Sequence, residues 1–180
     1  MDLELYKRIE NSSAHTQNRI DNGNFIVQNP HLLTDLVPFC FEISNKLHIR
    51  ACCILEKVFE IQLDLSFNYL NFICENLSNL KNDSAIRSMS RFLMLLVKDN
   101  LKKKYLSENQ LEKITESSFD WLILDYRVAV KHHAVNILIE TGKKTSWIYP
   151  ELKTILEKEI EFPSPGYRCI VKKFLKIINS

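Results

Sequence analysis

Two adjacent histidines, His132 and His133, follow Lys131 in the apolar segment VAVKHHAV, residues 128–135. Imidazole is a common metal ligand and can act as a general base near neutral pH. On a helix, neighbouring residues point about 100° apart, so the two rings diverge, whereas residues four apart share an ion more readily. We therefore interpret these histidines as packing and surface residues of a helix.

His48 and Cys52 have that four-residue spacing, which would allow both side chains to reach one metal ion. Two ligands are too few for a zinc site, and the chain has neither a CxxC pair nor an HExxH motif. It also lacks the GxxxxGK(S/T) and GxGxxG loops that bind phosphates. No catalytic triad can be assigned, so the sequence predicts no catalytic residue, cofactor or metal.

A basic cluster is the main candidate for a binding surface. Its lysines fall in two expected loops and on the expected last helix, at Lys102, Lys103, Lys104, Lys143, Lys144, Lys172 and Lys173. If equivalent loops lie on one side of the fold, these lysines form a surface for a polyanion or a partner. We favour the competing interpretation, in which they are solvated lysines near glutamate partners.

The composition favours helices. Hydrophobic residues make up 46% of the 180 residues, and only three glycines and five prolines are present. The longest apolar run, residues 92–97, is far too short to cross a bilayer, and the charged start MDLELYKRIE does not resemble a signal peptide. We expect a cytoplasmic protein whose five cysteines are reduced.

The net charge of +2 conceals an asymmetry between the two halves of the chain. Residues 1–90 carry 8 Lys/Arg against 11 Asp/Glu, and residues 91–180 carry 16 against 11. The basic C-terminal half could attract polyanions.

Four segments align without gaps and share a basic residue at one position. They are NKLHIRACCILEKVF, NDSAIRSMSRFLMLL, YRVAVKHHAVNILIE and PSPGYRCIVKKFLKI, with Arg50, Arg87, Lys131 and Arg168 at the shared position. The spacings are 37, 44 and 37 residues, and the polar stretch KKKYLSENQ, expected to be a loop, accounts for the longer one. Such a period predicts a repeat fold.

The positions one before and three, six and seven after the basic residue fall on one helix face. The first of these columns contains Ile49, Ile86, Val130 and Tyr167, and the column six residues after contains Glu56, Leu93, Ile137 and Phe174. The pattern predicts four amphipathic helices, and the shared basic residues are expected to be structural.

A second set of helical patterns lies between them, within residues 33–41, 63–77, 111–122 and 152–160. Pro150 suits the first turn of the helix expected over residues 152–160, Asp83 and Ser84 offer a cap for the helix that contains Arg87, and Gly142 ends the one that contains Lys131. In the leader, residues 5–9 predict one helix, while Asn22-Gly23-Asn24 weakens a second over residues 20–27.

We therefore expect an all-α fold, an α-α superhelix that forms a single domain over residues 1–180. It would contain a helical leader at 1–29 and four helix pairs at approximately 30–60, 61–98, 107–142 and 147–180.

Over roughly residues 30–180 the chain resembles HEAT-like repeats. The resemblance rests on an apolar–basic dipeptide that opens the second helix of each pair, at Ile49-Arg50, Ile86-Arg87, Val130-Lys131 and Tyr167-Arg168. It implies that each basic residue bonds to the neighbouring unit. Lys131 departs from the pattern because lysine lacks the planar fork of arginine.

The run FDWLILDYRVAVKHHAVNILIETGKKTSWIYPELKTILEKE resembles a family of small Bacteroidetes-type helical proteins. Members of that family often carry an adenylosuccinate lyase label. The sequence does not support that activity, because the enzyme is more than twice as long and needs a mobile GSSxMPxKxN loop. The only echo of that loop is Ser12-Ser13.

Some HEAT-like proteins are DNA glycosylases that use Asp and Trp side chains in a concave groove. Residues of matching type are Asp120, Trp121, Asp125, Tyr126, Trp147 and Tyr149. Both tryptophans fit apolar patterns, which favours packing at repeat interfaces over catalysis.

The leading hypothesis is a non-catalytic helical-repeat interaction module that binds an unknown protein or peptide partner. Nucleic-acid binding through the basic C-terminal half is the first alternative, and DNA base excision is the second. No membrane partner is expected.

Overall fold

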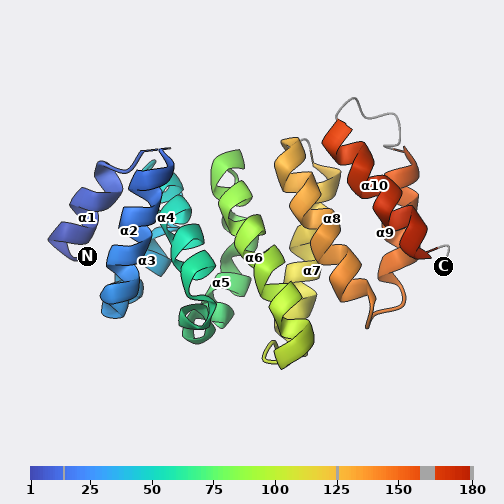
Figure 1. The fold of residues 1–180 in the computed structure, drawn as a ribbon, viewed down its shortest axis with the longest axis horizontal. Coiled ribbons are helices and arrows are strands. Elements are labelled where there is room, and N and C mark those ends of the chain that lie inside the picture. The colour runs from blue at the N-terminus through green and yellow to red at the C-terminus, as the bar shows by residue number, and fades with distance from the viewer. Residues whose placement is uncertain (14, 125, 159–164, 179–180) are drawn as a thin grey trace. The chain divides into compact units, whose positions relative to one another are not determined.

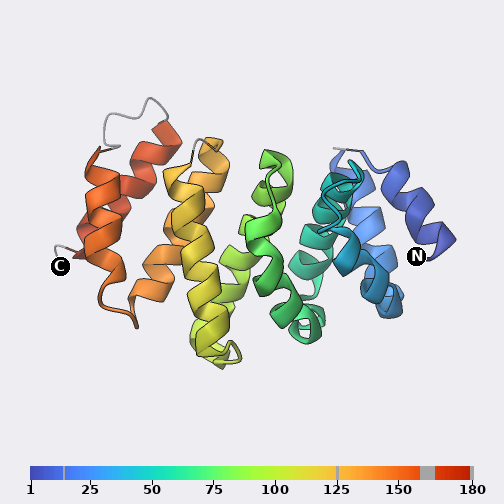
Figure 2. The same ribbon diagram turned by 180° about the vertical axis from the view of Figure 1, so that it is seen from behind.

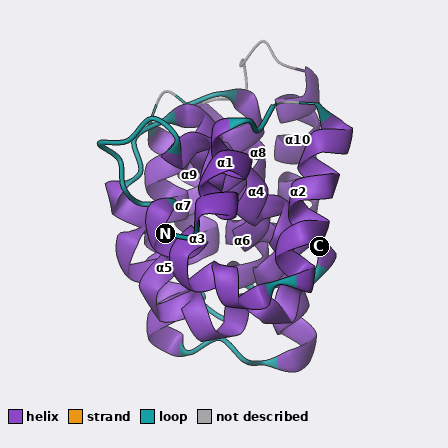
Figure 3. Ribbon diagram, turned by 90° about the vertical axis from the view of Figure 1, so that its left-hand side faces the viewer, coloured by secondary structure: helices purple, strands orange, loops and turns teal. Residues whose placement is uncertain are grey.

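The computed structural model describes residues 1–13, 15–124, 126–158 and 165–178. Within these ranges every regular element is helical, as Figure 3 shows, which confirms the all-α prediction. Three elements are short 3-10 helices, η1 (Pro30–Leu32), η2 (Leu63–Tyr69) and η3 (Leu77–Asn79). The α-helices are α1 (Leu3–Glu10), α2 (Thr16–Gln28), α3 (Leu33–Phe39), α4 (His48–Ile61), α5 (Leu70–Asn76), α6 (Asp83–Lys103), α7 (Glu108–Ile123), α8 (Val128–Gly142), α9 (Ile148–Lys158) and α10 (Pro165–Ile178).

The helices form two compact units, unit 1 (Met1–Phe92) and unit 2 (Leu93–Ser180). Helix α6 contributes residues to both units, because the division falls within it. The expectation of a single domain stays a prediction. Among the described residues, no helix combines the length and the apolar character that a membrane crossing requires.

Unit 1 is organised around α4, which contacts α1, α2 and α3. Figures 1 and 2 both show α2 and α4 side by side. Leu5 of α1, Leu36 of α3 and Val58 of α4 have no exposed surface. The burial of such apolar side chains provides the main stabilisation of the unit.

The second leader helix, α2, continues through Asn22-Gly23-Asn24, where the sequence analysis expected it to be weak. A Cβ atom at Gly23 would lie 2.9 Å from Cγ of Lys57 and 3.0 Å from Cδ1 of Ile61, both on α4. The glycine therefore permits the close approach of α2 to α4. This packing offsets the poor helix propensity of glycine, which costs about 1 kcal/mol relative to alanine.

Unit 2 contains the antiparallel pair α7 and α8, with α9 and α10 against α8. Helix α7 begins at a capping box, in which Ser107 Oγ accepts from Gln110 N and Gln110 Oε1 accepts from Ser107 N. Helix α8 ends at Gly142, as predicted, and Pro150 lies in the first turn of α9. Side chains such as Leu122, Leu138 and Leu156 are completely buried in this unit.

The repeated columns of the sequence are mostly buried. Ile86, Val130 and Tyr167 have no exposed surface, whereas Ile49 is half-buried. In the column six residues after the basic position, Leu93, Ile137 and Phe174 are also fully buried. Glu56 occupies the same column, and its residue is only 2% exposed.

Three local predictions were wrong. The predicted helix over residues 63–77 is divided into η2, α5 and η3. Within η2, Ser66 Oγ donates a hydrogen bond to the Leu63 carbonyl, and such local bonds compete with α-helical hydrogen bonding. The cap of α6 is Asn82, whose Oδ1 accepts from the backbone N–H of Ser84 and Ala85. Lys102 and Lys103 lie in the last turn of α6, not in a loop.

Candidate functional site

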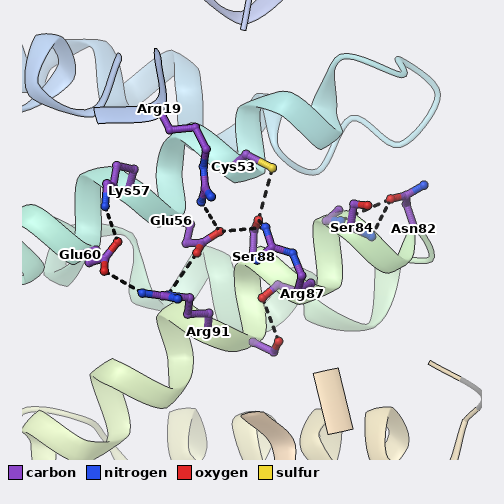
Figure 4. A network of polar contacts seen from close by, with 12 residues as sticks. Arg19, Cys53, Glu56, Lys57, Glu60, Asn82, Ser84, Arg87, Ser88 and Arg91 are labelled. Atoms are coloured by element: carbon purple, nitrogen blue, oxygen red, sulfur yellow. Dashed lines mark hydrogen bonds and ion pairs between the residues drawn. The ribbon is translucent and has the colours of Figure 1, made fainter. Parts of the chain in front are cut away.

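Unit 1 contains a buried carboxylate surrounded by arginines, shown in Figure 4. Oε2 of Glu56 lies 3.0 Å from Nη2 of Arg19 and 3.6 Å from Nη2 of Arg87, and Oε1 lies 3.3 Å from Nε of Arg91. Arg91 also pairs with Glu60 at 2.7 Å. We call Arg19, Glu56, Lys57, Glu60, Arg87 and Arg91 the Glu56 cluster.

The Glu56 cluster contains more cations than carboxylates. Lys57 Nζ lies 2.8 Å from Glu60 Oε2, and this hydrogen bond, followed by the charge of Arg91, lowers the pKa of Glu60. The buried Nε–H of Arg19 has no hydrogen-bond acceptor among the described residues. The cluster therefore combines a structural ion-pair network with hydrogen-bond donors that its own carboxylates do not satisfy.

Unit 2 carries a groove of about 440 Å³ between the end of α6, one face of α7 and the connection from α8 to α9. Its apolar lining consists of Val97, Leu101, Leu111, Trp147 and Ile148. Pockets that are largely apolar but have a few charged groups are typical of ligand-binding sites. We call this feature the acidic groove because four glutamates line it.

Carboxylates dominate the charge of the acidic groove. Glu108, Glu112 and Glu116 recur every four residues, which places them on one face of α7, and all three are exposed. Glu140 also lines the groove, and Lys144 is the one cation among the described lining residues. A ligand with positive charge therefore matches the groove.

Trp147 was expected to be packed in a repeat interface, and the structure shows such a contact together with substantial exposure. Its side chain is 53% exposed, and its ring stacks on Phe119 of α7 with centroids 5.6 Å apart. Tyr149, two residues later, is half-buried: its ring contacts Phe174 edge-on and its hydroxyl donates to the Ile139 carbonyl at 2.9 Å. Tyr149 is therefore the more buried of the two aromatic residues, and Trp147 lines the acidic groove.

The candidate lysines do not form one uniform surface. Lys103 pairs with Asp99 at 3.2 Å, and Lys143 pairs with Glu140. Lys102 and Lys104 are exposed at the end of α6, and Lys144 lines the acidic groove. Lys172 and Lys173 are exposed on α10, where Lys173 lines a cavity of about 470 Å³ together with Lys98, His132 and Glu140.

The two adjacent histidines have different surroundings. His133 is 9% exposed, while His132 is half-buried, and their rings are nearly perpendicular at 71°. Burial, together with the charge of Lys173, lowers the pKa of His132. These observations agree with their interpretation as packing and surface residues.

His48 and Cys52 are both buried and converge on one carbonyl. Nδ1 of His48 lies 3.1 Å from the Cys40 carbonyl oxygen, and Cys52 Sγ lies 3.5 Å from the same atom. In the part of the chain that the structure describes, no group of three His, Cys, Asp or Glu side chains is arranged to hold a metal ion.

The residues of base-excision type differ in exposure. Trp121 is only 3% exposed, whereas Asp120 is exposed to solvent. Asp125 lies outside the described residues, as do Ile160 and Pro163 from the sequence patterns. The role of these residues in base excision stays a hypothesis.

The basic residues of the repeat positions have diverse surroundings. Arg50 donates to the Glu10 carbonyl of α1, and Arg87 pairs with Glu56 of α4. Lys131 is 4% exposed, and Arg168 is exposed on α10. The structural role predicted for all four stays a prediction.

Sequence reasoning missed both the Glu56 cluster and the acidic groove. Signals for them were present: Glu56 is the only charged residue in an otherwise apolar column, and Glu108, Glu112 and Glu116 have helical four-residue spacing.

In comparisons with known proteins, no family model, curated protein or solved structure matches this chain.

Proposed function

We propose that the chain is a HEAT-like helical-repeat module, an α-α superhelix that binds a protein or peptide partner without catalysing a reaction. The repeated apolar–basic dipeptides and the burial of their columns support the repeat architecture. The observation that carries the binding function is the exposed ring of Trp147 in the acidic groove. Tryptophan is enriched among the residues that dominate binding energy at protein interfaces.

The ligand that fits the acidic groove is a segment in which a large apolar side chain is flanked by Lys or Arg. The apolar side chain would lie against Trp147 and Leu111, and the flanking cations would face Glu108, Glu112 and Glu116 of α7. Apolar contact would supply most of the affinity, and the carboxylates would favour basic over acidic segments.

A selection of displayed random peptides on the intact protein tests this proposal. The expected result is enrichment of sequences that combine Lys or Arg with a large apolar residue. Trp147→Ala and Glu112→Lys should each weaken binding of a selected synthetic peptide about tenfold or more. Because Trp147 is half exposed, its replacement should leave the thermal unfolding of the protein nearly unchanged.

Glu157→Lys is the matched control, because Glu157 is an exposed carboxylate on α9 whose ion pair with Lys153 is 3.8 Å long. It should leave peptide affinity unchanged. Selected peptides that are acidic, or that bind the Trp147→Ala protein equally well, would rule out the acidic groove as the binding site.

Nucleic-acid binding is the second candidate, supported by the cavity that Lys98 and Lys173 line. A labelled DNA duplex separates the two functions. Salt-sensitive binding that is lost in a Lys172→Gln/Lys173→Gln protein and kept in Trp147→Ala would favour the nucleic-acid function.

A further inference from the structure

Unit 1 contains a pocket of about 410 Å³ that is lined by three arginines from three helices. Arg19 belongs to α2, Arg50 to α4 and Arg87 to α6. Serine hydroxyls and two further side chains complete the lining, at Ser12, Ser13, Ile49, Cys53 and Ser84. We call this the arginine pocket, and none of the described residues that line it is a carboxylate.

The three guanidinium groups are held in place from outside the arginine pocket. The buried carboxylate of Glu56 pairs with Arg19 and Arg87, and the backbone carbonyl of Glu10 accepts a hydrogen bond from Arg50. Arg87 also donates to Ser88 Oγ at 3.4 Å. Each guanidinium has five N–H donors, which is more than these contacts use. A site whose side chains are already ordered loses less entropy when it binds.

We propose that the arginine pocket binds a phosphate monoester. The planar fork of arginine matches two phosphate oxygens, and guanidinium–phosphate hydrogen bonds are stronger than neutral ones. The hydroxyls of Ser12, Ser13 and Ser84 are further donors on the same lining. Arg50 and Arg87 thus bind a ligand in addition to any role in repeat packing.

The charge of the surrounding unit favours a single phosphate group over a nucleic-acid backbone. Unit 1 carries 11 Asp/Glu against 9 Lys/Arg, so its net charge is slightly negative and the unit as a whole does not attract a long polyanion. The arginine pocket is a local concentration of positive charge within that acidic unit. A monoester also carries a charge of about −1.5 to −2 at pH 7, more than each diester of a backbone.

Calorimetric titration of the intact protein tests the proposal, with inorganic phosphate, a phosphoserine peptide, glucose 6-phosphate and a DNA duplex as probes. Inorganic phosphate should bind and raise the unfolding temperature. If the phosphoserine peptide binds more tightly than glucose 6-phosphate, the natural ligand is a phosphorylated protein. If glucose 6-phosphate binds more tightly than the peptide, the natural ligand is a small molecule. No binding of any monoester, or tighter binding of the duplex, would overturn the proposal.

Arg50→Gln and Arg87→Gln should each weaken phosphate binding about tenfold or more, because each removes charge-assisted hydrogen bonds. Lys46→Gln is the matched control, since Lys46 is an exposed cation of unit 1 outside the pocket lining. An equal loss of affinity in Lys46→Gln would show general charge attraction and contradict a defined pocket. Trp147→Ala should leave phosphate affinity unchanged, which separates this site from the acidic groove.

Alkylation of the unaltered protein provides a test that does not depend on the folding of a variant. Cys53 lines the arginine pocket and is half-buried, whereas Cys169 is exposed on α10 in unit 2. Saturating phosphate should slow the reaction of Cys53 with iodoacetamide and leave that of Cys169 unchanged, as followed by peptide mass spectrometry. Unchanged reactivity of Cys53 at saturating phosphate would place the ligand elsewhere.

Discussion

The carboxylate of Glu56 on α4 lies 3.0 Å from the guanidinium of Arg19 on α2, and the Glu56 side chain is 1% exposed. Arg87 and Arg91 of α6 approach the same carboxylate. One buried charge therefore connects three helices of unit 1. The desolvation of such a charge is costly, and its partners must compensate for that cost.

Replacement of Glu56 by Gln should lower the free energy of unfolding by about 3 kcal/mol. The amide would leave three guanidinium groups without their shared counter-charge while nearly preserving the shape of the side chain. Urea denaturation followed by circular dichroism measures the loss. We place it at the low end of the range for buried pairs because the arginines keep 24% to 40% of their side-chain surface exposed.

Glu4→Gln is the comparison for this experiment. Glu4 pairs with Arg8 at 3.0 Å, but its side chain is 60% exposed, so the change should cost less than about 1 kcal/mol. Equal losses in the two variants would show that the burial of Glu56 has no energetic consequence.

The helices and their buried faces could be predicted because burial imposes a 3.6-residue period on the sequence. Ile86, Val130 and Tyr167 were placed in one column by that period, and all three are fully buried. The capping preferences of proline and glycine predicted the start of α9 near Pro150 and the end of α8 at Gly142.

The partners of Glu56 could not be predicted in the same way. Arg19 is 37 residues away from Glu56 in the chain. A local sequence pattern does not indicate which side chains of different helices come into contact. The exposure of Trp147 was equally hidden, because Trp147 and Tyr149 are both aromatic residues near the start of α9. The difference in their exposure depends on the contacts of the Tyr149 ring with Phe174 and Ile139, which the sequence does not reveal.

That packing yields a second prediction, at Gly142. A Cβ atom there would overlap the ring of Tyr149, which the hydrogen bond to Ile139 and the contact with Phe174 hold in place. Gly142→Ala should therefore lower the free energy of unfolding by about 1–3 kcal/mol, as expected for overpacking. Thermal or urea unfolding measures this difference.

Gly23→Ala should have a smaller effect than Gly142→Ala. The nearest atoms to the added methyl group are Cγ of Lys57 at 2.9 Å and Cδ1 of Ile61 at 3.0 Å, a milder overlap than with the Tyr149 ring at Gly142. The better helix propensity of alanine offsets part of the strain, by about 0.5–1 kcal/mol. A larger loss at Gly23 than at Gly142 would contradict the ring-packing argument.

His132 should make the stability of the protein depend on pH. Burial first, and then the ammonium of Lys173, lower its pKa below the ordinary value of 6.5. Lys98 and Glu140 line the same cavity, and Asn136 lies one turn away on α8. The folded protein therefore binds a proton at His132 less readily than the unfolded chain does.

The sign of the effect follows from this difference in proton binding. Above pH 6.5 both states are neutral at His132, whereas below it the unfolded chain gains a proton first. The free energy of unfolding should fall as the pH drops from about 6.5 to the lower pKa of the folded state and then level off. Urea denaturation at pH 5.5 and 7.5 measures the change, which should be smaller in His132→Gln. Lys173→Gln should reduce the change only in part, because burial contributes more than Lys173 to the lowered pKa of His132. If the pH dependence is the same in His132→Gln as in the unaltered protein, other groups cause it.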